Sequence, residues 1–230
     1  MQEENKIPRH VGFIMDGNGR WAKKQNKPRN FGHVKGADRV DEIVSACFEK
    51  GIECVSLYAF STENWQRPKE EVDKIIEILK KFLKVYVNKL VKNEVKMICS
   101  GDVSVLPSDV YSLILETEQK TEHFKGKTLN IAVNYGGRQE ILKAVNELIN
   151  SNVNSVSESD FSSHLYTNGL PDIDLVVRTS GEQRISNFFI WQIAYAELYF
   201  TDTLWPDFDS AELDKALTWY SLRNRRFGKI

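Results

Sequence analysis

The stretch His10-Val-Gly-Phe-Ile-Met-Asp-Gly-Asn-Gly-Arg-Trp21 decides how this chain folds. Its apolar start predicts a buried strand over residues 10–15. The two glycines that follow allow a tight turn with backbone angles that other residues rarely adopt. A strand that ends in such a turn is typical of folds in which strands alternate with helices, and the rest of the chain continues this alternation.

Strand and helix patterns alternate along most of the sequence. Short apolar runs predict further strands over residues 53–60, 95–100, 128–135, 173–177 and 198–200. Apolar spacings of three and four predict helices over 70–92 and near 34–50, 107–124, 138–150 and 210–224. The segment 150–159, rich in Ser and Asn, is predicted to be a surface loop. We therefore expect an α/β fold, a single domain over residues 1–230 with a mostly parallel central sheet flanked by helices.

The composition is that of an ordinary globular protein. The 230 residues contain 31 Lys and Arg against 32 Asp and Glu, and 41% of them are hydrophobic. These values exclude a disordered tail, a collagen-like fibre and a disulfide-stapled miniprotein. The near-neutral charge also argues against a nucleic-acid partner. The polar N-terminus, the lack of an uninterrupted apolar span and three scattered cysteines favour a cytoplasmic protein, with peripheral contact to a membrane left open.

Positive charge is concentrated in two segments. Residues 16–39 contain seven positive and two negative side chains, and residues 223–230 contain four positive ones. The first segment starts at the glycine turn, where backbone N–H groups can point at an anion. Asp16 could hold a divalent cation there, and Arg20 could neutralise a phosphate. His33 could donate to a phosphate or transfer a proton, or be a plain structural histidine.

The glycine turn has other interpretations. An EF-hand loop requires different residues where Arg20 and Trp21 stand, so that interpretation fails. A dinucleotide fingerprint requires a third glycine where Ala22 stands, so it fails as well. A plain strand-to-helix turn capped by Asp16 remains the alternative to an anion site.

Polar and aromatic side chains follow the second predicted strand. Ser61 and Asn64 supply neutral polar groups, Arg67 supplies a cation, and Trp65 supplies an apolar wall. Because parallel strands end at the same edge of a sheet, these side chains should face the same crevice as the glycine turn. The loop could also be a helix entry with a hydroxyl cap and Pro68 near the start, and the two interpretations are compatible.

The fifth predicted strand leads into a second glycine turn. Arg178, Arg184 and Ser186 flank this turn, and guanidinium groups match the oxygens of a diphosphate. The alternative is a surface loop in which one arginine pairs with Glu182. Further along, Glu197 interrupts an apolar stretch, and a buried carboxylate needs a partner or a metal ion.

Together these segments resemble the cis-prenyltransferase family. The matching motifs lie, in family order, at residues 10–21, 29–33, 58–65 with Arg67, 134–138, 178–187, 192–200 and 225–228. Ser180 is a departure, because many members have glycine there. The resemblance implies an α/β fold distinct from the all-helical trans-prenyltransferases, whose Asp-rich motifs this sequence lacks. It also implies Mg²⁺-dependent condensation of an allylic diphosphate, commonly farnesyl diphosphate, with successive isopentenyl diphosphates in cis geometry by a homodimer.

The resemblance carries roles to individual residues. Asp16 and Glu197 would bind Mg²⁺, and Asp16 would help the allylic diphosphate to leave. The residues implied to contact the substrates are Gly17, Asn18, Gly19, Arg20, Trp21, Arg29, His33, Ser61, Glu63, Trp65, Arg67, Arg178, Arg184, Ser186, Arg226 and Gly228. The segment 226–228 would reach the isopentenyl diphosphate site of the partner subunit. Besides Asp16, the candidate catalytic residues are Asn64, Ser61 and His33, and the base is one of these three or a phosphate oxygen.

The growing product would also need an apolar tunnel. The helix over 70–92 and the strand residues Val55, Leu57 and Ile98 could line it, or they could be plain core. The main rival hypothesis is a non-catalytic subunit that keeps the fold and binds a partner, but the catalytic residues are all present. A phosphatase would need a second carboxylate where Asn18 stands.

Overall fold

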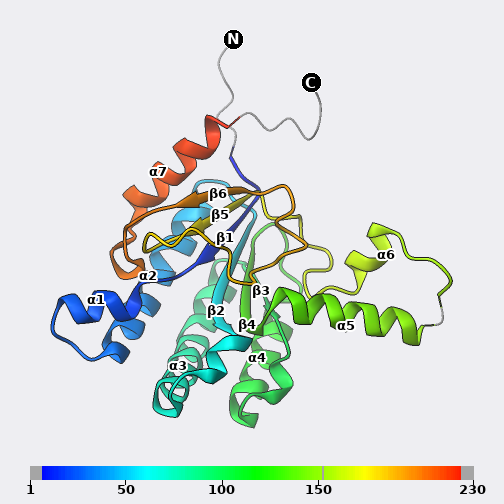
Figure 1. Cartoon of the computed structure of the whole chain (residues 1–230), viewed down its shortest axis with the longest axis horizontal. Coiled ribbons are helices and arrows are strands. Elements are labelled where there is room, and N and C mark those ends of the chain that lie inside the picture. The colour runs from blue at the N-terminus through cyan, green and yellow to red at the C-terminus, as the bar shows by residue number, and fades with distance from the viewer. Residues whose placement is uncertain (1–6, 152, 224–230) are drawn as a thin grey trace.

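The structure, a computed structural model, describes residues 7–151 and 153–223. Its centre is a six-stranded sheet with the strand order β3-β4-β2-β1-β5-β6, in which every neighbouring pair is parallel (Figure 1). The strands are β1 (His10–Ile14), β2 (Cys54–Ser61), β3 (Lys96–Ser100), β4 (Thr128–Tyr135), β5 (Leu175–Arg178) and β6 (Glu197–Phe200). All the predicted strands are therefore confirmed, as is the parallel sheet.

Strand β1 lies where the strand order reverses. Phe13 of β1 pairs with Leu57 of β2 on one side and with Val177 of β5 on the other. Chain segments that leave the carboxyl ends of β1 and β5 therefore diverge. In open α/β sheets this is where a ligand crevice forms.

The predicted helices are all present. The helices are α1 (Asn18–Lys24), α2 (Arg29–Glu49), α3 (Lys69–Lys92), α4 (Ser108–Thr121), α5 (Gly137–Asn150), α6 (Glu158–Ser163) and α7 (Ser210–Ser221). Short 3₁₀ turns occupy Thr62–Gln66, Val103–Val105 and Trp205–Asp207. Helices α1 and α6 were not predicted, because each is too short for a periodic pattern to show. Among the described residues, no helix is both long and apolar enough to span a membrane.

Four helices cover one face of the sheet. The apolar residues of α2, α3, α4 and α7 form one large core cluster with side chains of β1 to β5. In α3, Ile76, Leu83 and Leu90 recur every seven residues on the buried face, which keeps an apolar stripe turned toward the sheet. Val55 is part of this core, with none of its surface exposed.

The opposite face is aromatic and polar, and Phe188 and Phe189 of the segment that precedes β6 cover it. Helix α5 extends away from the sheet and packs with α6 (Figure 1). Phe188 lies against Gly12, where a Cβ atom would come within 2.8 Å of the phenyl ring. His10 is fully buried here: its Nδ1 lies 2.7 Å from the carbonyl oxygen of Pro171 and its Nε2 lies 2.7 Å from the Ser56 hydroxyl. Burial lowers the pKa of His10 to about 4, so the imidazole is neutral at physiological pH.

Helices α1 and α2 approach each other at two glycines. A Cβ atom at Gly32 would lie 1.9 Å from the backbone oxygen of Asn18, and one at Gly36 would lie 2.2 Å from the Asn18 side-chain oxygen. Since these glycines are four residues apart, they lie on the same face of α2. They leave room for the start of α1 and so fix the turn that follows β1.

Candidate active site

A polar crevice of about 550 Å³ lies at the carboxyl ends of β1, β2 and β5. Its lining includes the predicted residues Asp16, Ser61, Glu63, Asn64, Arg67, Arg178, Arg184 and Ser186. Three loops that are far apart in the sequence thus meet at one edge of the sheet, as the parallel strands predicted.

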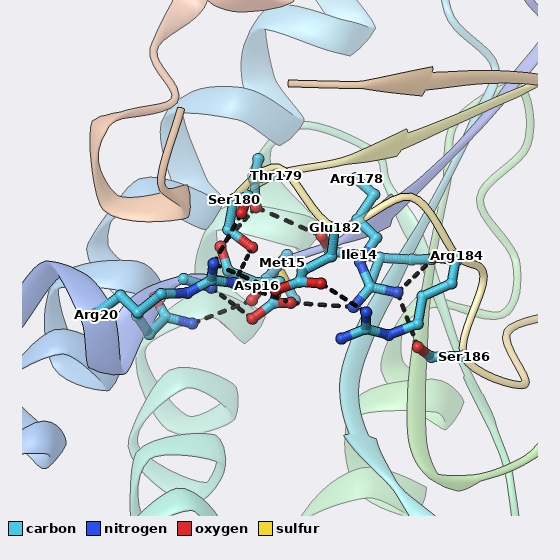
Figure 2. A network of polar contacts seen from close by, with 12 residues as sticks. Ile14, Met15, Asp16, Arg20, Arg178, Thr179, Ser180, Glu182, Arg184 and Ser186 are labelled. Atoms are coloured by element: carbon cyan, nitrogen blue, oxygen red, sulfur yellow. Dashed lines mark hydrogen bonds and ion pairs between the residues drawn. The ribbon is translucent and has the colours of Figure 1, made fainter. Parts of the chain in front are cut away.

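Asp16 lies directly after β1 and is held from several sides (Figure 2). Its carboxylate accepts hydrogen bonds from Arg178 Nη2 at 3.0 Å and from the Gly17 N–H at 2.7 Å. The Thr179 hydroxyl donates to the Asp16 backbone oxygen at 2.6 Å, which fixes the main chain. Burial alone would raise the pKa of Asp16, but the hydrogen bonds and the charges of Arg178 and Arg20 together lower it. The carboxylate is therefore ionised over a wide pH range.

Arg178 joins the two sides of the crevice. Its side chain is only 4% exposed, at the end of β5. Besides Asp16, its guanidinium donates to the Ser186 hydroxyl at 2.7 Å and to the Arg184 backbone oxygen. The Arg184 side chain is more exposed and pairs with Glu182 at 2.5 Å, so the predicted ion pair is present as well. The glycine turn therefore presents two arginines and a hydroxyl to one side of the crevice.

Arg20 extends from α1 over the same turn (Figure 2). Its guanidinium donates to the backbone oxygen of Ser180 at 2.9 Å and to the Ser180 hydroxyl at 2.5 Å. It also lies 3.5 Å from the Asp16 carboxylate and 3.4 Å from that of Glu182. Ser180 has a φ of 81°, in the region that favours glycine, and its hydroxyl is used to hold an arginine.

A second charged cluster surrounds Glu71, in the first turn of α3. Its Oε1 accepts from Arg29 Nε at 3.0 Å and from Arg67 Nη1 at 2.9 Å, and His33 Nε2 lies 3.4 Å away. Burial would raise the pKa of Glu71, but its bonds to Arg29 and Arg67 lower it. Burial and the two arginines lower the pKa of His33, which Glu71 only partly opposes.

The sequence did not single out Glu71. A weak signal was present, because Glu71 lies at the start of the predicted helix over 70–92, four residues after Arg67 in the preceding loop. The carboxylate gathers three residues predicted to bind substrate, which come from α2 and from the end of the 3₁₀ turn.

The loop after β2 is both a helix entry and a wall of the crevice. Ser61 and Asn64 form a reciprocal capping box around the 3₁₀ turn, with the Ser61 N–H donating to Asn64 Oδ1 at 3.1 Å. Trp65 donates to Asn134 at 2.8 Å, and Glu63 accepts from Asn187 at 2.9 Å. The capped helix entry is therefore confirmed, and Ser61, Asn64 and Arg67 also line the crevice, but the predicted wall residue Trp65 does not.

An apolar pocket of about 170 Å³ adjoins the polar crevice and shares Met15, Tyr58, Asn64 and Arg67 with it. The apolar lining includes Val40, Leu57, Ile75, Leu79, Phe82 and Trp205, from α2, β2, α3 and the 3₁₀ turn before α7. Asn18 and His33 also reach this pocket, and Asn18 Oδ1 is buried without a hydrogen-bond partner among the described residues. Of the tunnel residues suggested from sequence, Leu57 lines the pocket, whereas Val55 and Ile98 do not.

Trp21 and Gly19 are predicted site residues that pack elsewhere in the fold. Trp21 stacks on Phe31 and donates to Asp207 at 2.6 Å, and it lines neither cavity. Gly19 packs against the side chain of Arg29. The prediction of roles for Arg226 and Gly228 concerns residues outside the described part of the chain.

Glu197 is not brought next to Asp16 within one chain. It begins β6 opposite Leu175, the first residue of β5, whereas Asp16 follows the last residue of β1. The register places Glu197 level with Val11 of β1, five residues before Asp16 and about 16 Å from it along the strand direction. Glu197 instead accepts from Arg223 Nε at 3.1 Å. Within the described residues, no three His, Cys, Asp or Glu side chains are grouped as a metal site.

Comparison with known proteins agrees with this geometry. Residues 14–228 match the family model described as "Putative undecaprenyl diphosphate synthase". An isoprenyl transferase of Fusobacterium nucleatum is 48% identical over 99% of this chain and 98% of its own length, and one of Prochlorococcus marinus is 49% identical over 99% and 86%.

Two solved structures have the same fold. Lavandulyl diphosphate synthase from Lavandula x intermedia, in complex with dimethylallyl diphosphate, aligns with a TM-score of 0.93 and 36% identity over 97% of this chain and 99% of that one. A probable undecaprenyl diphosphate synthase from Campylobacter jejuni aligns with a TM-score of 0.82 and 35% identity over 97% and 100%. Since the family match and these alignments each span nearly the whole chain, the chain belongs to this prenyltransferase family.

Proposed function

We propose that this prenyltransferase elongates an allylic diphosphate, farnesyl diphosphate, with isopentenyl diphosphate in cis geometry. The product would be a long-chain polyprenyl diphosphate such as undecaprenyl diphosphate, the precursor of the lipid carrier for cell-wall synthesis. The observation that carries the proposal is the contact between a cationic crevice and an apolar pocket, which share Asn64 and Arg67. A prenyl diphosphate has the same two parts, an anionic head and a hydrocarbon chain.

The reaction breaks the bond between the allylic carbon and its diphosphate oxygen, and the diphosphate leaves with the electron pair. The double bond of isopentenyl diphosphate attacks that carbon, and loss of a proton restores a double bond. Charge that develops on the leaving diphosphate must be neutralised by groups already in position. Arg20, Arg29 and Arg67 are the cations proposed for the allylic diphosphate. Arg178, Arg184 and Ser186 are proposed to hold isopentenyl diphosphate.

We propose Mg²⁺ as the cofactor, with Asp16 as its protein ligand. An ionised carboxylate at the crevice fits this ion, because Mg²⁺ is often bound by one or two carboxylates together with substrate phosphates. When bound, the ion would add positive charge next to the leaving group. Arg178 already holds Asp16 at 3.0 Å, so the carboxylate is oriented before substrate arrives.

We also propose a homodimer in which Glu197 and the segment 226–228 serve the partner's site. The position of Glu197 at the amino end of β6 supports this assignment, since one chain does not unite it with Asp16. A cytoplasmic enzyme with peripheral membrane contact would suit a lipid product. Light scattering would test the dimer, and flotation with vesicles would test the membrane contact.

The decisive experiment incubates the purified chain with farnesyl diphosphate, labelled isopentenyl diphosphate and Mg²⁺, and measures the product by mass spectrometry. We expect a polyprenyl series that lengthens with time and disappears when EDTA is added. Substrate binding without any incorporation would instead favour a non-catalytic binding subunit.

A further inference from the structure

The buried carboxylate of Glu140, in the first turn of α5, has no role in the chemistry above. Glu140 is 1% exposed and accepts three hydrogen bonds. Its donors are the Tyr135 hydroxyl at 2.5 Å, Gln192 Nε2 at 3.0 Å and the Tyr166 N–H at 2.9 Å. One carboxylate therefore ties the end of β4 to two separate segments, around residues 166 and 192.

The second of these segments contains a strained loop. Ser186, Asn187 and Phe189 have φ angles of 47°, 65° and 40°, all in the left-handed region that non-glycine residues rarely adopt. Such angles persist only where the surrounding structure fixes them. A loop of this kind would relax if the contacts that hold it were removed.

The first turn of α5 supplies those contacts. The Gly137 N–H donates to the backbone oxygen of Asn187 at 2.8 Å, and the Arg138 N–H donates to the Asn187 side chain at 2.9 Å. A Cβ atom at Gly137 would lie 2.9 Å from the side chain of Ile190, so the helix and the loop are in close contact. Glu140 adds the anchor at the far end of the loop, through Gln192.

The strained loop leads directly into the crevice. The Ser186 hydroxyl and the Arg184 backbone oxygen both accept from the buried Arg178 guanidinium. A small shift of the loop would therefore move the Ser186 hydroxyl and Arg184 relative to a bound diphosphate, and it would take two acceptors away from Arg178.

We propose that Glu140 is a positioning residue for the isopentenyl diphosphate subsite, which it holds in place by anchoring the strained loop over residues 185–192. This inference rests on the proposed function for the assignment of that subsite. The three residues that donate hydrogen bonds to Glu140 do not line the crevice. Glu140 therefore acts on the crevice through the loop. Burial raises the pKa of Glu140 despite its three hydrogen bonds, which is consistent with a structural role for the carboxyl group.

The test compares E140A and E140Q with the wild type and with E147A as the matched control. Glu147 lies on the same helix, pairs with Lys143 at 2.9 Å and has 44% of its side chain exposed. The readouts are the KM for each substrate, kcat, and the affinity for isopentenyl diphosphate by calorimetry. Circular dichroism and thermal melting report whether each variant is folded.

For E140A we expect the KM for isopentenyl diphosphate to rise roughly tenfold or more, because misplacement by about 1 Å can cost two orders of magnitude. The KM for the allylic substrate should stay within about twofold, and kcat should fall less than the isopentenyl KM rises. E140Q should show a smaller change of the same kind. Gln192 Oε1 has no partner among the described residues, so a turned Gln192 amide could accept from the new NH₂ group. E147A should match the wild type.

A lower melting temperature with an unchanged isopentenyl KM would overturn the proposal, as would an equal rise for both substrates. If E140A does not fold, E140Q and Y135F carry the test. E140Q changes the acceptor, and Y135F removes one of its donors.

Calorimetry separates this inference from the proposed function. A wild-type chain that binds isopentenyl diphosphate without turnover, and binds it more weakly in E140A, would overturn the function and keep the anchor. A wild-type chain that does not bind it would overturn both.

Discussion

Asp16 and Glu71 each hold two arginines, but they do so in different parts of the fold. Asp16 follows β1, and its buried partner Arg178 ends β5, so both are fixed by the sheet. Glu71 lies at the start of α3, and its partner Arg29 begins α2 with 61% of its side chain exposed. The first cluster buries its arginine at the edge of the sheet, with 4% of Arg178 exposed against 34% of Asp16. The second buries its carboxylate between helices, with 12% of Glu71 exposed against 61% of Arg29.

This difference teaches which charges can change partners. A buried ion pair loses several kcal/mol when one partner is removed, because the other is left without compensation. The two arginines of the helix cluster are more exposed than Arg178, so a ligand can reach them without uncovering a buried guanidinium. We infer that the sheet cluster sets the geometry of the reaction, and that the arginines of the helix cluster exchange Glu71 for a diphosphate. Changes in the first should lower kcat, and changes in the second should act on KM.

The largest effect is expected for Asp16→Ala. The substitution removes the proposed metal ligand and leaves Arg178 buried without its carboxylate. Turnover should fall by roughly a thousandfold or more, since charge neutralisation at the leaving group supplies several kcal/mol of the catalysis. Incorporation of labelled isopentenyl diphosphate measures the loss, and calorimetry should show diphosphate binding largely intact. Asp38→Ala, at an exposed ion pair with Lys35, is the control. Near-normal turnover would remove Asp16 from the metal site.

The second effect tests whether the sheet cluster needs a guanidinium. Arg178 contacts Asp16, Ser186 and the Arg184 backbone oxygen at once. The single ammonium of lysine does not reproduce this fork. For Arg178→Lys we expect kcat to fall, and kcat/KM for isopentenyl diphosphate to fall with it by about a hundredfold. Steady-state kinetics at saturating allylic substrate measures it, and a change of less than threefold would mean that charge alone is sufficient.

The third effect belongs to the helix cluster. Glu71→Gln keeps the shape of the side chain and removes the charge that Arg29 and Arg67 share. Because Glu71 competes with the diphosphate for these two arginines, we expect the KM for the allylic diphosphate to fall by several-fold, with kcat near the wild-type value. If Glu71→Gln lowered kcat as much as Arg178→Lys does, the contrast between the two clusters would be lost.

The smallest effect on activity is expected for a change at His10, the buried first residue of the strand that precedes Asp16. This change tests how the strand's stability depends on pH. The pKa of His10 is about 4 in the fold against 6.5 in a model peptide. The folded state therefore binds fewer protons, so stability present above pH 6.5 is lost as the pH falls toward 4. The loss is about 3 kcal/mol over this range.

Urea unfolding at pH 7, 6, 5 and 4 measures that loss, and His10→Gln should flatten its pH dependence while lowering stability at pH 7. The carboxylates of Asp16 and Glu71 have pKa values below 3.8 and 4.5, so they add little above pH 5. An equal slope in His10→Gln would show that another group controls acid unfolding.

The sequence predicted the parallel sheet and the convergence of its loops, because both follow from periodicity and from the rule for parallel strands. It missed the Glu71 cluster, because the approach of α2 to α3 is set by tertiary packing rather than by local pattern. Glu197 is instructive in another way. It stands just before the predicted strand over 198–200, which already places it at the amino end of the sheet, away from Asp16. The position of Glu197 along the predicted strand therefore indicated its place in the sheet, which its expected burial did not.

Gly32 and Gly36 have a consequence for how variation in this protein should be interpreted. Neither glycine carries a group that could react, yet a single added methyl group at either would meet Asn18 within 2.2 Å or less. In a library of random variants selected for growth, both positions would tolerate no replacement, and they would look like members of the catalytic machinery. Substitutions at exposed arginines such as Arg29 would be tolerated better in the screen, although these residues are proposed to bind the substrate. A position that accepts no substitution in such a screen could therefore be one where packing around Asn18 leaves no space for a side chain, rather than one that takes part in the reaction.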